Sequence, residues 1–302
     1  MSTVKIDATI AALEAVSSRL QLLEETLRGL PTGPQMRPAC YVGDNRVLTV
    51  TIRGDRMYVD SRDVAISPGI LCWGGWEEET AAHLERFLKP GMVWADVGAN
   101  CGYFTVIGHK RVRSGGSLGE THAFDVSPNN FRRCVDNLAL SWMSSGSYVE
   151  NMAIYSEERN LTFQIFEKYG TNSGLGGVSE EHAIYTGDRP KPTEVRAITL
   201  DAYFSGRRPP EFIKIDIEGG EWHALQGARG LIASQPDLRL LIEWSPLQLL
   251  NCGTEPRALA ELIPALGLRC FNADNEMAAL SIEDCLTLQD TTMFLLSRTV
   301  PA

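Results

Sequence analysis

The stretch that decides the fold is Val93-Trp94-Ala95-Asp96-Val97-Gly98-Ala99-Asn100-Cys101-Gly102-Tyr103-Phe104-Thr105. An apolar strand leads into a D-x-G-x-x-x-G turn, and a helix follows. Glycines allow sharp turns and close approach to a ligand, as at the carboxyl end of the first strand in nucleotide-binding α/β folds. The spacing differs from the G-x-G-x-x-G of dinucleotide sites. An acid before the first glycine suits a cofactor with an ammonium or sulfonium group better than one with a pyrophosphate.

Strands and helices alternate from residue 92 onward. Two of the expected helices are Asn129–Leu140 and Gly220–Ile232, and this alternation predicts a mainly parallel sheet covered on both faces. Leu161–Phe166 is expected as an added strand, ahead of a loop from Gly170 to Gly177 that is rich in Gly, Asn and Ser. The seven candidate strands of the sheet are Met92–Val97, Thr121–Asp125, Tyr148–Ala153, Phe212–Asp216, Leu238–Glu243, Leu268–Asn272 and Thr292–Leu296.

The segment Ile6–Leu30 has heptad spacing. Its apolar residues recur at steps of three and four, like the a and d positions of a coiled coil, and Pro and Gly residues end the pattern by Pro34. The pattern favours a homodimer formed through this helix and leaves open an amphipathic helix that packs on its own chain, because three heptads are marginal alone. Three regions are expected: residues 1–34 with this helix, residues 35–75 with a β-hairpin (Arg46–Ile52 and Arg56–Val59), and the α/β domain of residues 76–302, which begins with a helix at Trp76–Leu88.

Composition and charge exclude several classes of protein. The net charge of −10 argues against binding to nucleic acid or anionic membrane, since both need a basic face. No apolar run approaches the roughly 18 residues of a membrane span, and the N-terminus does not resemble a signal peptide. The seven cysteines are widely spaced without a C-x-x-C pair, which argues against a disulfide framework or a zinc site. These features predict a cytoplasmic enzyme without a structural metal.

A second acid follows the glycine loop by about 20 residues. Asp125 ends the predicted second strand and precedes Val126-Ser127-Pro128. An acid at this offset binds the hydroxyls of a ribose in nucleotide-binding folds. The alternative for Asp125 is an acid that stabilises the N-terminus of the following helix. Its pairing with the glycine loop favours the ribose role.

A third signal lies in the predicted strand Phe212–Asp216. Strand alternation places the side chains of Lys214 and Asp216 on the same face. Charges inside a buried sheet are costly unless they are paired, so this pair at a strand end is a candidate functional site. The alternative for Lys214 is a structural ion pair, for example with Glu221 or Glu243.

From about Trp76 to Ser297 the chain resembles the FkbM family of S-adenosylmethionine-dependent methyltransferases. The motifs that carry the resemblance are residues 88–91, 96–105, 123–128, 198–201, 214–221, 225–228 and 241–243. The resemblance implies a seven-stranded class I (Rossmann-like) methyltransferase fold with the last strand antiparallel, and S-adenosyl-L-methionine as cofactor. Where the family usually has Glu-Pro after the second strand, this chain has Asp125-Val126, so the shorter acid must reach further.

The resemblance also implies a set of cofactor contacts. The methionine end would lie at the glycine loop, the ribose at Asp125 beside Val126, and the adenine near Asn151 to Ala153. Glu77 resembles a family acid near the cofactor. The predicted cofactor-binding residues are Glu77, Asp96, Gly98, Asn100, Gly102, Tyr103, Asp125, Val126, Asn151, Ala153 and Asp216.

Methyl transfer to a hydroxyl or amide needs alignment and a base. The predicted catalytic residues are Asp216, Glu218, Lys214 and His182, with Asp216 in the best position; Glu243 and His223 are further candidates for the base, although His223 suits a packed or exposed helix position better. Carboxylates two residues apart are weak evidence for Mg²⁺, so no metal is predicted.

The predicted function is O-methylation of a hydroxyl on a sugar or natural-product small molecule. N-methylation of an amide or peptide side chain is the alternative, because the same fold and cofactor site would serve it. A non-catalytic interaction protein is disfavoured by the intact motifs, and an NAD-dependent dehydrogenase by the missing G-x-G-x-x-G. The acceptor pocket is expected to involve Gly69–Glu79, Lys168–Asp188 and Trp244–Thr254.

Overall fold

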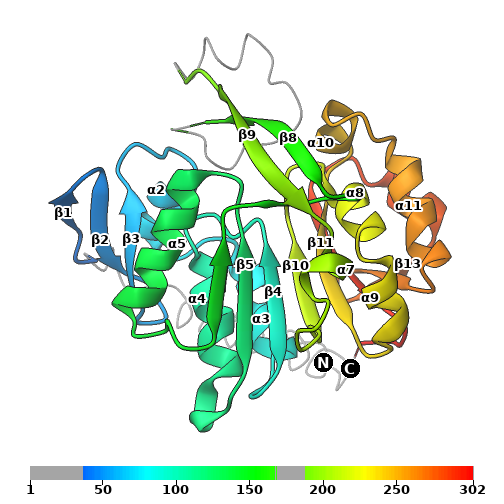
Figure 1. The fold of residues 1–302 in the computed structure, drawn as a ribbon, viewed down its shortest axis with the longest axis horizontal. Coiled ribbons are helices and arrows are strands. Elements are labelled where there is room, and N and C mark those ends of the chain that lie inside the picture. Colours follow the sequence, from blue (N-terminus) through cyan, green and yellow to red (C-terminus); the bar gives the residue numbers. More distant parts are fainter. Residues whose placement is uncertain (1–36, 167, 169–187, 302) are drawn as a thin grey trace, which may run out of the picture. The chain divides into compact units, whose positions relative to one another are not determined.

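The structure is a computed structural model that describes residues 37–166, 168 and 188–301. The predicted N-terminal helix, the loop from Gly170 to Gly177 and His182 lie outside the described residues. The described part contains one large sheet, two three-stranded sheets and the helices around them (Figure 1).

The large sheet contains eight strands in the order β13-β12-β14-β11-β10-β4-β5-β6. The strands from β11 to β6 are parallel, and β14 runs antiparallel between β11 and β12. The predicted architecture is therefore confirmed, but the predicted count of seven strands is wrong, because the chain folds back after β12 and adds the edge strand β13. The strands are β4 (Val93–Val97), β5 (Glu120–Phe124), β6 (Ser147–Glu150), β10 (Phe212–Ile215), β11 (Arg239–Trp244), β12 (Arg269–Asn272), β13 (Ala278–Leu280) and β14 (Thr292–Ser297).

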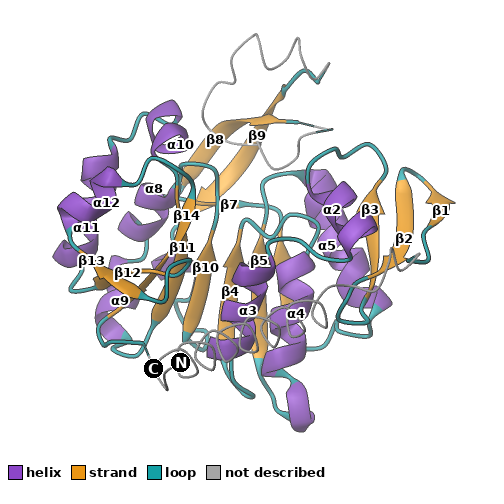
Figure 2. Cartoon of the chain, turned by 180° about the vertical axis from the view of Figure 1, so that it is seen from behind, coloured by secondary structure: helices purple, strands orange, loops and turns teal. Residues whose placement is uncertain are grey.

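Strand alternation divides the core into two layers. In β4, Val93, Ala95 and Val97 join the cluster packed under α7, α8, α9, α11 and α12, whereas Trp94 joins the cluster under α3 and α4. Figures 1 and 2 show the two groups of helices on either side of the sheet. The helices are α2 (Ile66–Trp73), α3 (Glu78–Phe87), α4 (Tyr103–Val112), the short 3-10 helix η1 (Ser114–Gly116), α5 (Pro128–Leu140), α7 (Leu200–Tyr203), α8 (Glu221–Gln226), α9 (Arg229–Ser234), α10 (Pro246–Asn251), α11 (Pro256–Ala265) and α12 (Ile282–Thr287).

Two predicted elements are divided in the structure. The single helix expected at Gly220–Ile232 is wrong: α8 ends at Gln226, and the carboxylate of Asp201 accepts hydrogen bonds from the amides of Gly230 and Leu231 (2.8 and 2.7 Å) at the start of α9. This side-chain cap stabilises a new helix start. The strand expected at Tyr148–Ala153 is likewise two elements, β6 and the short strand β7 (Ala153–Ile154).

A second sheet has the order β7-β9-β8. The predicted added strand is confirmed as β8 (Arg159–Ile165), whereas its long partner β9 (Lys191–Ile198) was not predicted. Figures 1 and 2 show β8 and β9 beyond the end of the large sheet at which β4, β5 and β10 finish. This sheet therefore lies over the edge where the sequence places the cofactor.

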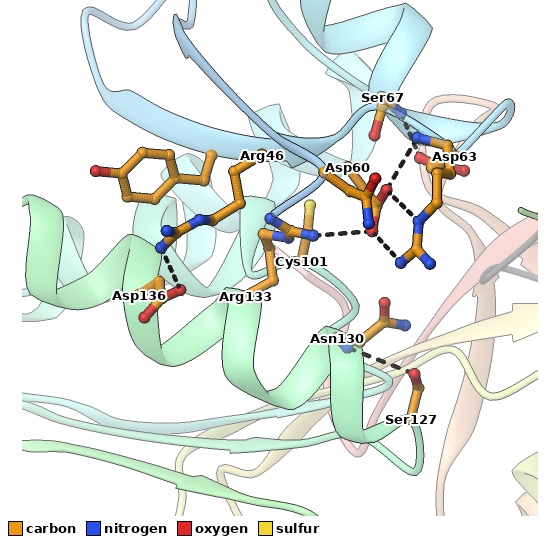
Figure 3. Close-up of polar contacts among 12 residues, drawn as sticks. Arg46, Asp60, Asp63, Ser67, Cys101, Ser127, Asn130, Arg133 and Asp136 are labelled. Atoms are coloured by element: carbon orange, nitrogen blue, oxygen red, sulfur yellow. Dashed lines mark hydrogen bonds and ion pairs between the residues drawn. The ribbon is translucent and has the colours of Figure 1, made fainter. Parts of the chain in front are cut away.

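The N-terminal sheet packs on α5. The predicted hairpin is confirmed as β2 (Arg46–Val50) and β3 (Arg56–Asp60), with an additional strand β1 (Cys40–Gly43). Arg133 of α5 donates to Asp60 at the end of β3 (2.8 Å), as Figure 3 shows. The fully buried side chain of Asn137 accepts from the amide of Tyr58 (2.7 Å) and donates to the carbonyl of Cys101 (2.7 Å). These bonds join the N-terminal sheet to the glycine loop.

No helix in the described ranges combines the length and the apolar character that crossing a membrane would require.

Candidate active site

A cavity of about 750 Å³ lies where β4, β5 and β10 end. Its polar lining comes mainly from the loops after these strands, and its apolar lining comes from the ends of β4 and β5, the following loops, β7 and β8. The lining residues are Val97, Gly98, Asn100, Phe124, Asp125, Val126, Met152, Ala153, Ile154, Tyr155, Phe163, Asp216, Ile217, Glu218, Gly220 and Cys252.

The glycine loop packs directly against the end of β10. Gly98 has φ of +88°, and a Cβ atom at this position would lie 1.8 Å from the carbonyl oxygen of Asp216. Only glycine allows both the turn and this contact. Asn100 also has a positive φ, +48°, and its side-chain oxygen accepts from the amide of Cys101 (2.7 Å). The loop therefore presents its backbone to the cavity in a fixed conformation.

Asp125 lies at the end of β5 and faces the same cavity. Its carboxylate accepts hydrogen bonds from the amides of Asn100 and Ser127, both at 2.8 Å. Burial raises the pKa of Asp125 to about 6. The side chain of Asn151 donates to the backbone carbonyl of Asp125 (2.8 Å), so it joins the ends of two strands. Asp125 therefore places a buried carboxylate at the cavity.

Lys214 is a buried cation between two carboxylates. Its Nζ lies 2.9 Å from Asp216 Oδ2 and 3.8 Å from Asp96 Oδ1, and 4.9 Å from the ring centre of Phe104. The predicted shared face of Lys214 and Asp216 agrees with this geometry. The carboxylates hold the pKa of Lys214 above its ordinary value despite burial. The pairing is therefore not with Glu221 or Glu243, the partners suggested by the sequence, since neither forms an ion pair with Lys214 in the described residues.

Negative charge exceeds positive charge around Lys214. Burial and neighbouring carboxylates raise the pKa of Glu77, Glu218 and Glu243. Burial also raises the pKa of Asp96, whose Oδ1 has no hydrogen-bond partner. Burial is the largest cause of these raised pKa values, and the positive charge of Lys214 offsets it only in part. A ligand with positive charge, such as a sulfonium or ammonium group, fits this set of side chains. The set of interacting carboxyl groups near Lys214 has six members, those of Glu77, Asp96, Asp216, Glu218, Glu221 and Glu243.

Glu218 is held at the cavity by its backbone and by α10. Its φ is +57°, and Gly219 follows with φ of +99°. A Cβ atom at Gly219 would lie 2.3 Å from the carbonyl oxygen of Gln248. The side chain of Gln248 donates to Glu218 Oε2, and Cys252 Sγ lies 3.2 Å from the carbonyl oxygen of Glu218. A non-glycine residue in this conformation, supported from two sides, is typical of functional sites.

The structure brings together about half of the predicted site residues. The predicted residues that line the cavity are Gly98, Asn100, Asp125, Val126, Ala153, Asp216 and Glu218. Asp96 and Lys214 are buried beside it, and Asn151 joins two strand ends. Gly102 packs against Cys134 of α5, and the hydroxyl of Tyr103 donates to Glu78 (2.8 Å), so neither lines the cavity. Glu77 lines a neighbouring cleft.

Sequence reasoning predicted Ala153 of β7 but missed the other apolar side chains from this part of the cavity wall. Ile154, Tyr155 and Phe163 line the cavity, but nothing in a short apolar strand indicates which cavity it will cover. His223, a candidate base, instead stacks on Tyr155 and contacts Ser156 Oγ through Nδ1 (3.2 Å). No group of three or more His, Cys, Asp or Glu residues among those described is arranged to hold a metal ion.

A family model described as the methyltransferase FkbM domain matches residues 96–269, which is more than half of the chain. The chain therefore belongs to the FkbM methyltransferase family. It is an S-adenosylmethionine-dependent methyltransferase of the α/β fold class that the sequence predicted.

Solved structures with a similar fold have low sequence identity to the chain. The methyltransferase FkbM of Methylobacillus flagellatus is 14% identical with a TM-score of 0.41, and the match covers 72% of this chain and 50% of that chain. The O-methyltransferase of Bacillus cereus, in complex with SAH, is 13% identical with a TM-score of 0.42 and coverage of 74% and 81%. TYW2 of P. horikoshii, in complex with MeSAdo, is 10% identical with a TM-score of 0.44 and coverage of 86% and 74%. The chain thus spans half the length of the M. flagellatus protein. No curated protein sequence matches it.

Proposed function

We propose that the protein methylates a hydroxyl group of a sugar or natural-product small molecule. The observation that carries the proposal is Glu218, a carboxyl group that borders the cavity and whose pKa is well above its ordinary value. A hydroxyl must lose a proton when its oxygen is methylated. A base with a raised pKa accepts that proton more readily than an ordinary surface carboxylate.

The cofactor-binding roles follow the positions around the cavity. Asp125 would accept hydrogen bonds from the ribose, and Val126, Met152 and Ala153 would contact the adenine. The glycine loop, Asp96 and Glu77 would hold the methionine end, where the described carboxylates outnumber the cation Lys214 and therefore suit an ammonium group. S-adenosylmethionine supplies, when bound, a methyl group on a positively charged sulfur.

Two carboxylates of this chain then have different tasks. Asp216 is paired with Lys214 at 2.9 Å, so its carboxylate is already engaged by a cation. Glu218 is hydrogen-bonded to the neutral amide of Gln248 and has no ion pair among the described residues. Glu218 is therefore the better general base, and Asp216 orients Lys214 and the end of β10.

The test is an acceptor screen with methyl-¹³C-labelled S-adenosylmethionine, in which NMR identifies the methylated atom. The proposal expects carbon shifts of methoxy groups on hydroxylated sugars. Glu218→Gln should lower kcat by about 10²-fold or more, the usual contribution of a base, while S-adenosylhomocysteine still binds with the wild-type Kd in calorimetry. Transfer to amide nitrogens without any transfer to hydroxyls would contradict the proposal, as would full activity of Glu218→Gln.

A further inference from the structure

A second cavity, which we call the acidic cleft, is lined in part by Glu243 of β11, the strand next to β10. It measures about 740 Å³ and lies between the start of α3, the end of β11, the turn after β12 and the start of β14. Glu243 of β11 pairs across the sheet with Met293 of β14, and both line the cleft. Five of its lining residues are acidic and none is Lys or Arg within the part of the chain that is described. The acids are Glu77, Glu78, Glu79, Glu243 and Asp274.

The charge of most of these acids is not compensated by the protein. Glu78 is paired with Arg53 (2.7 Å) and accepts from the hydroxyl of Tyr103 (2.8 Å). The described residues provide no ion pair for the other four acids of the acidic cleft. The imidazole of His83, which interacts electrostatically with Asp274 and Glu79, does not replace the missing cation, since burial lowers its pKa below the ordinary value of 6.5.

Glu243 shows most directly that a partner is missing. Its Oε2 is buried and has no hydrogen-bond partner in the described residues. Leaving a carboxylate oxygen desolvated and unpaired is unfavourable, and natural sites satisfy such atoms with a ligand or with water. A metal ion does not fit, because the described side chains offer no group of metal ligands. A compact ammonium group, with three donors and one positive charge, fits the chemistry.

The acidic cleft lies close to the proposed point of methyl transfer. Asp216 borders the cofactor cavity and is near enough to Glu77 and Glu243 to raise the pKa of both. Asp216 and Glu243 directly follow Ile215 and Ile242, which are paired between the neighbouring strands β10 and β11, so the cofactor cavity and the acidic cleft lie at the same edge of the sheet. Glu77 is already assigned to the methionine end of the cofactor. Glu79, Glu243 and Asp274 therefore remain available to bind another molecule.

We infer that the acidic cleft binds the methyl acceptor and that this acceptor carries a protonated amino group, as an amino sugar does. The inference rests on the proposed function, because it names the chemical class of the hydroxylated acceptor. The ammonium group would be held by Glu243 with Glu79 and Asp274 around it, and the hydroxyl would then face Glu218. Carboxylates around a desolvated ammonium give both affinity and selection against neutral analogues.

The test compares probes that differ in charge. Glucosamine is compared with N-acetylglucosamine and with glucose, both as methyl acceptors and as ligands of the protein loaded with S-adenosylhomocysteine, by saturation-transfer NMR and calorimetry. We expect glucosamine to bind at least about tenfold more tightly than either neutral sugar. The same preference is expected in kcat/KM, and it should diminish as salt increases, since surface charges are screened.

Variants then locate the preference. The double variant Glu79→Gln/Glu243→Gln should bind glucosamine and N-acetylglucosamine with nearly equal affinity, so that the ratio of the two affinities falls to about one. Asp237→Asn removes an exposed acid at the opposite end of β11 and should leave the ratio unchanged. Equal affinity for the three sugars, binding of none of them, or a preference that survives the double variant would overturn the inference. Affinity for S-adenosylhomocysteine is measured on each protein, so that loss of the cofactor site, which would refute the proposed function, is recognised separately.

Discussion

The cofactor cavity and the acidic cleft lie at the same edge of the sheet but are built in different ways. The polar side of the cavity comes from loops that follow neighbouring parallel strands, and backbone amides satisfy its key carboxylate, Asp125. The acidic cleft comes from four separate elements, and among its carboxylates Glu78 has an ion pair, with Arg53, whereas the other four have none in the described protein. The difference suggests that backbone geometry shapes the constant part of the site, the cofactor cradle, whereas side-chain charge selects the acceptor.

The largest effect on stability is expected at Lys214, the buried cation beneath the cofactor cavity. Lys214→Met removes a buried cation and leaves Asp96 and Asp216 without it. Breaking a buried ion pair on one side costs about 3–5 kcal/mol, so the free energy of unfolding in urea should fall by that amount. Asp96→Asn should cost less, because Lys214 keeps Asp216 at 2.9 Å. A Lys214→Met protein of wild-type stability would show that this charge cluster is not structural.

The second effect concerns the backbone of the cradle. Gly98→Ala combines an unfavourable φ of +88° with an overlap against the carbonyl of Asp216. We expect a loss of about 2–4 kcal/mol in unfolding free energy and no measurable binding of S-adenosylhomocysteine. Gly115→Ala is the matched control, since Gly115 has φ of +66° and nothing within 4 Å of the added Cβ. Equal losses in the two variants would mean that the contact with β10 has no importance of its own.

The same contrast explains how much the sequence predicted. The cradle depends on Asp96, Gly98 and Asp125, which lie at strand ends, and parallel strands place their carboxyl ends at one edge. The sequence therefore predicted these residues together. The acidic cleft depends on Glu79, Glu243 and Asp274 meeting in space, and their sequence separations do not reveal which strands are neighbours. Glu243 was a candidate base by its strand position, but its unpartnered oxygen is visible only once β14 lies beside β11.

The third prediction tests the cradle by affinity instead of stability. Asp125→Asn should raise the Kd for S-adenosylhomocysteine about 10–100-fold in calorimetry, since hydrogen bonds to a charged acceptor contribute about 1.5–3 kcal/mol. Asparagine retains one acceptor and the size of the side chain, so the fold is expected to persist. A Kd within twofold of wild type would remove Asp125 from the cofactor site.

The pH dependence of this binding follows from the raised pKa of Asp125. Burial raises that pKa from 3.8 to about 6, so the carboxylate form is depleted below pH 6. The affinity for S-adenosylhomocysteine should therefore fall about tenfold for each pH unit below 6 and become constant above 7, and this pH dependence should be absent in Asp125→Asn.

The stability of the unbound protein depends on the charge of Asp125 in the opposite direction. The contribution of Asp125 to the free energy of unfolding is fully present below about pH 4 and is lost as the pH rises through 6, because the pKa of Asp125 is higher in the folded than in the unfolded protein.

The smallest effect is expected at the outer wall of the acidic cleft. Asp274 is exposed, and its Oδ2 accepts from the hydroxyl of Thr292 (2.7 Å) and the amide of Met293 (2.8 Å). Asp274→Asn keeps an acceptor for these donors, so the unfolding free energy should fall by less than about 1 kcal/mol. A loss close to that of Lys214→Met would instead make this carboxylate part of the scaffold. A small loss of unfolding free energy in Asp274→Asn, together with a large loss in Lys214→Met, would mean that the fold does not need the negative charge of the cleft wall. Selection of the ligand would then be the reason for this charge.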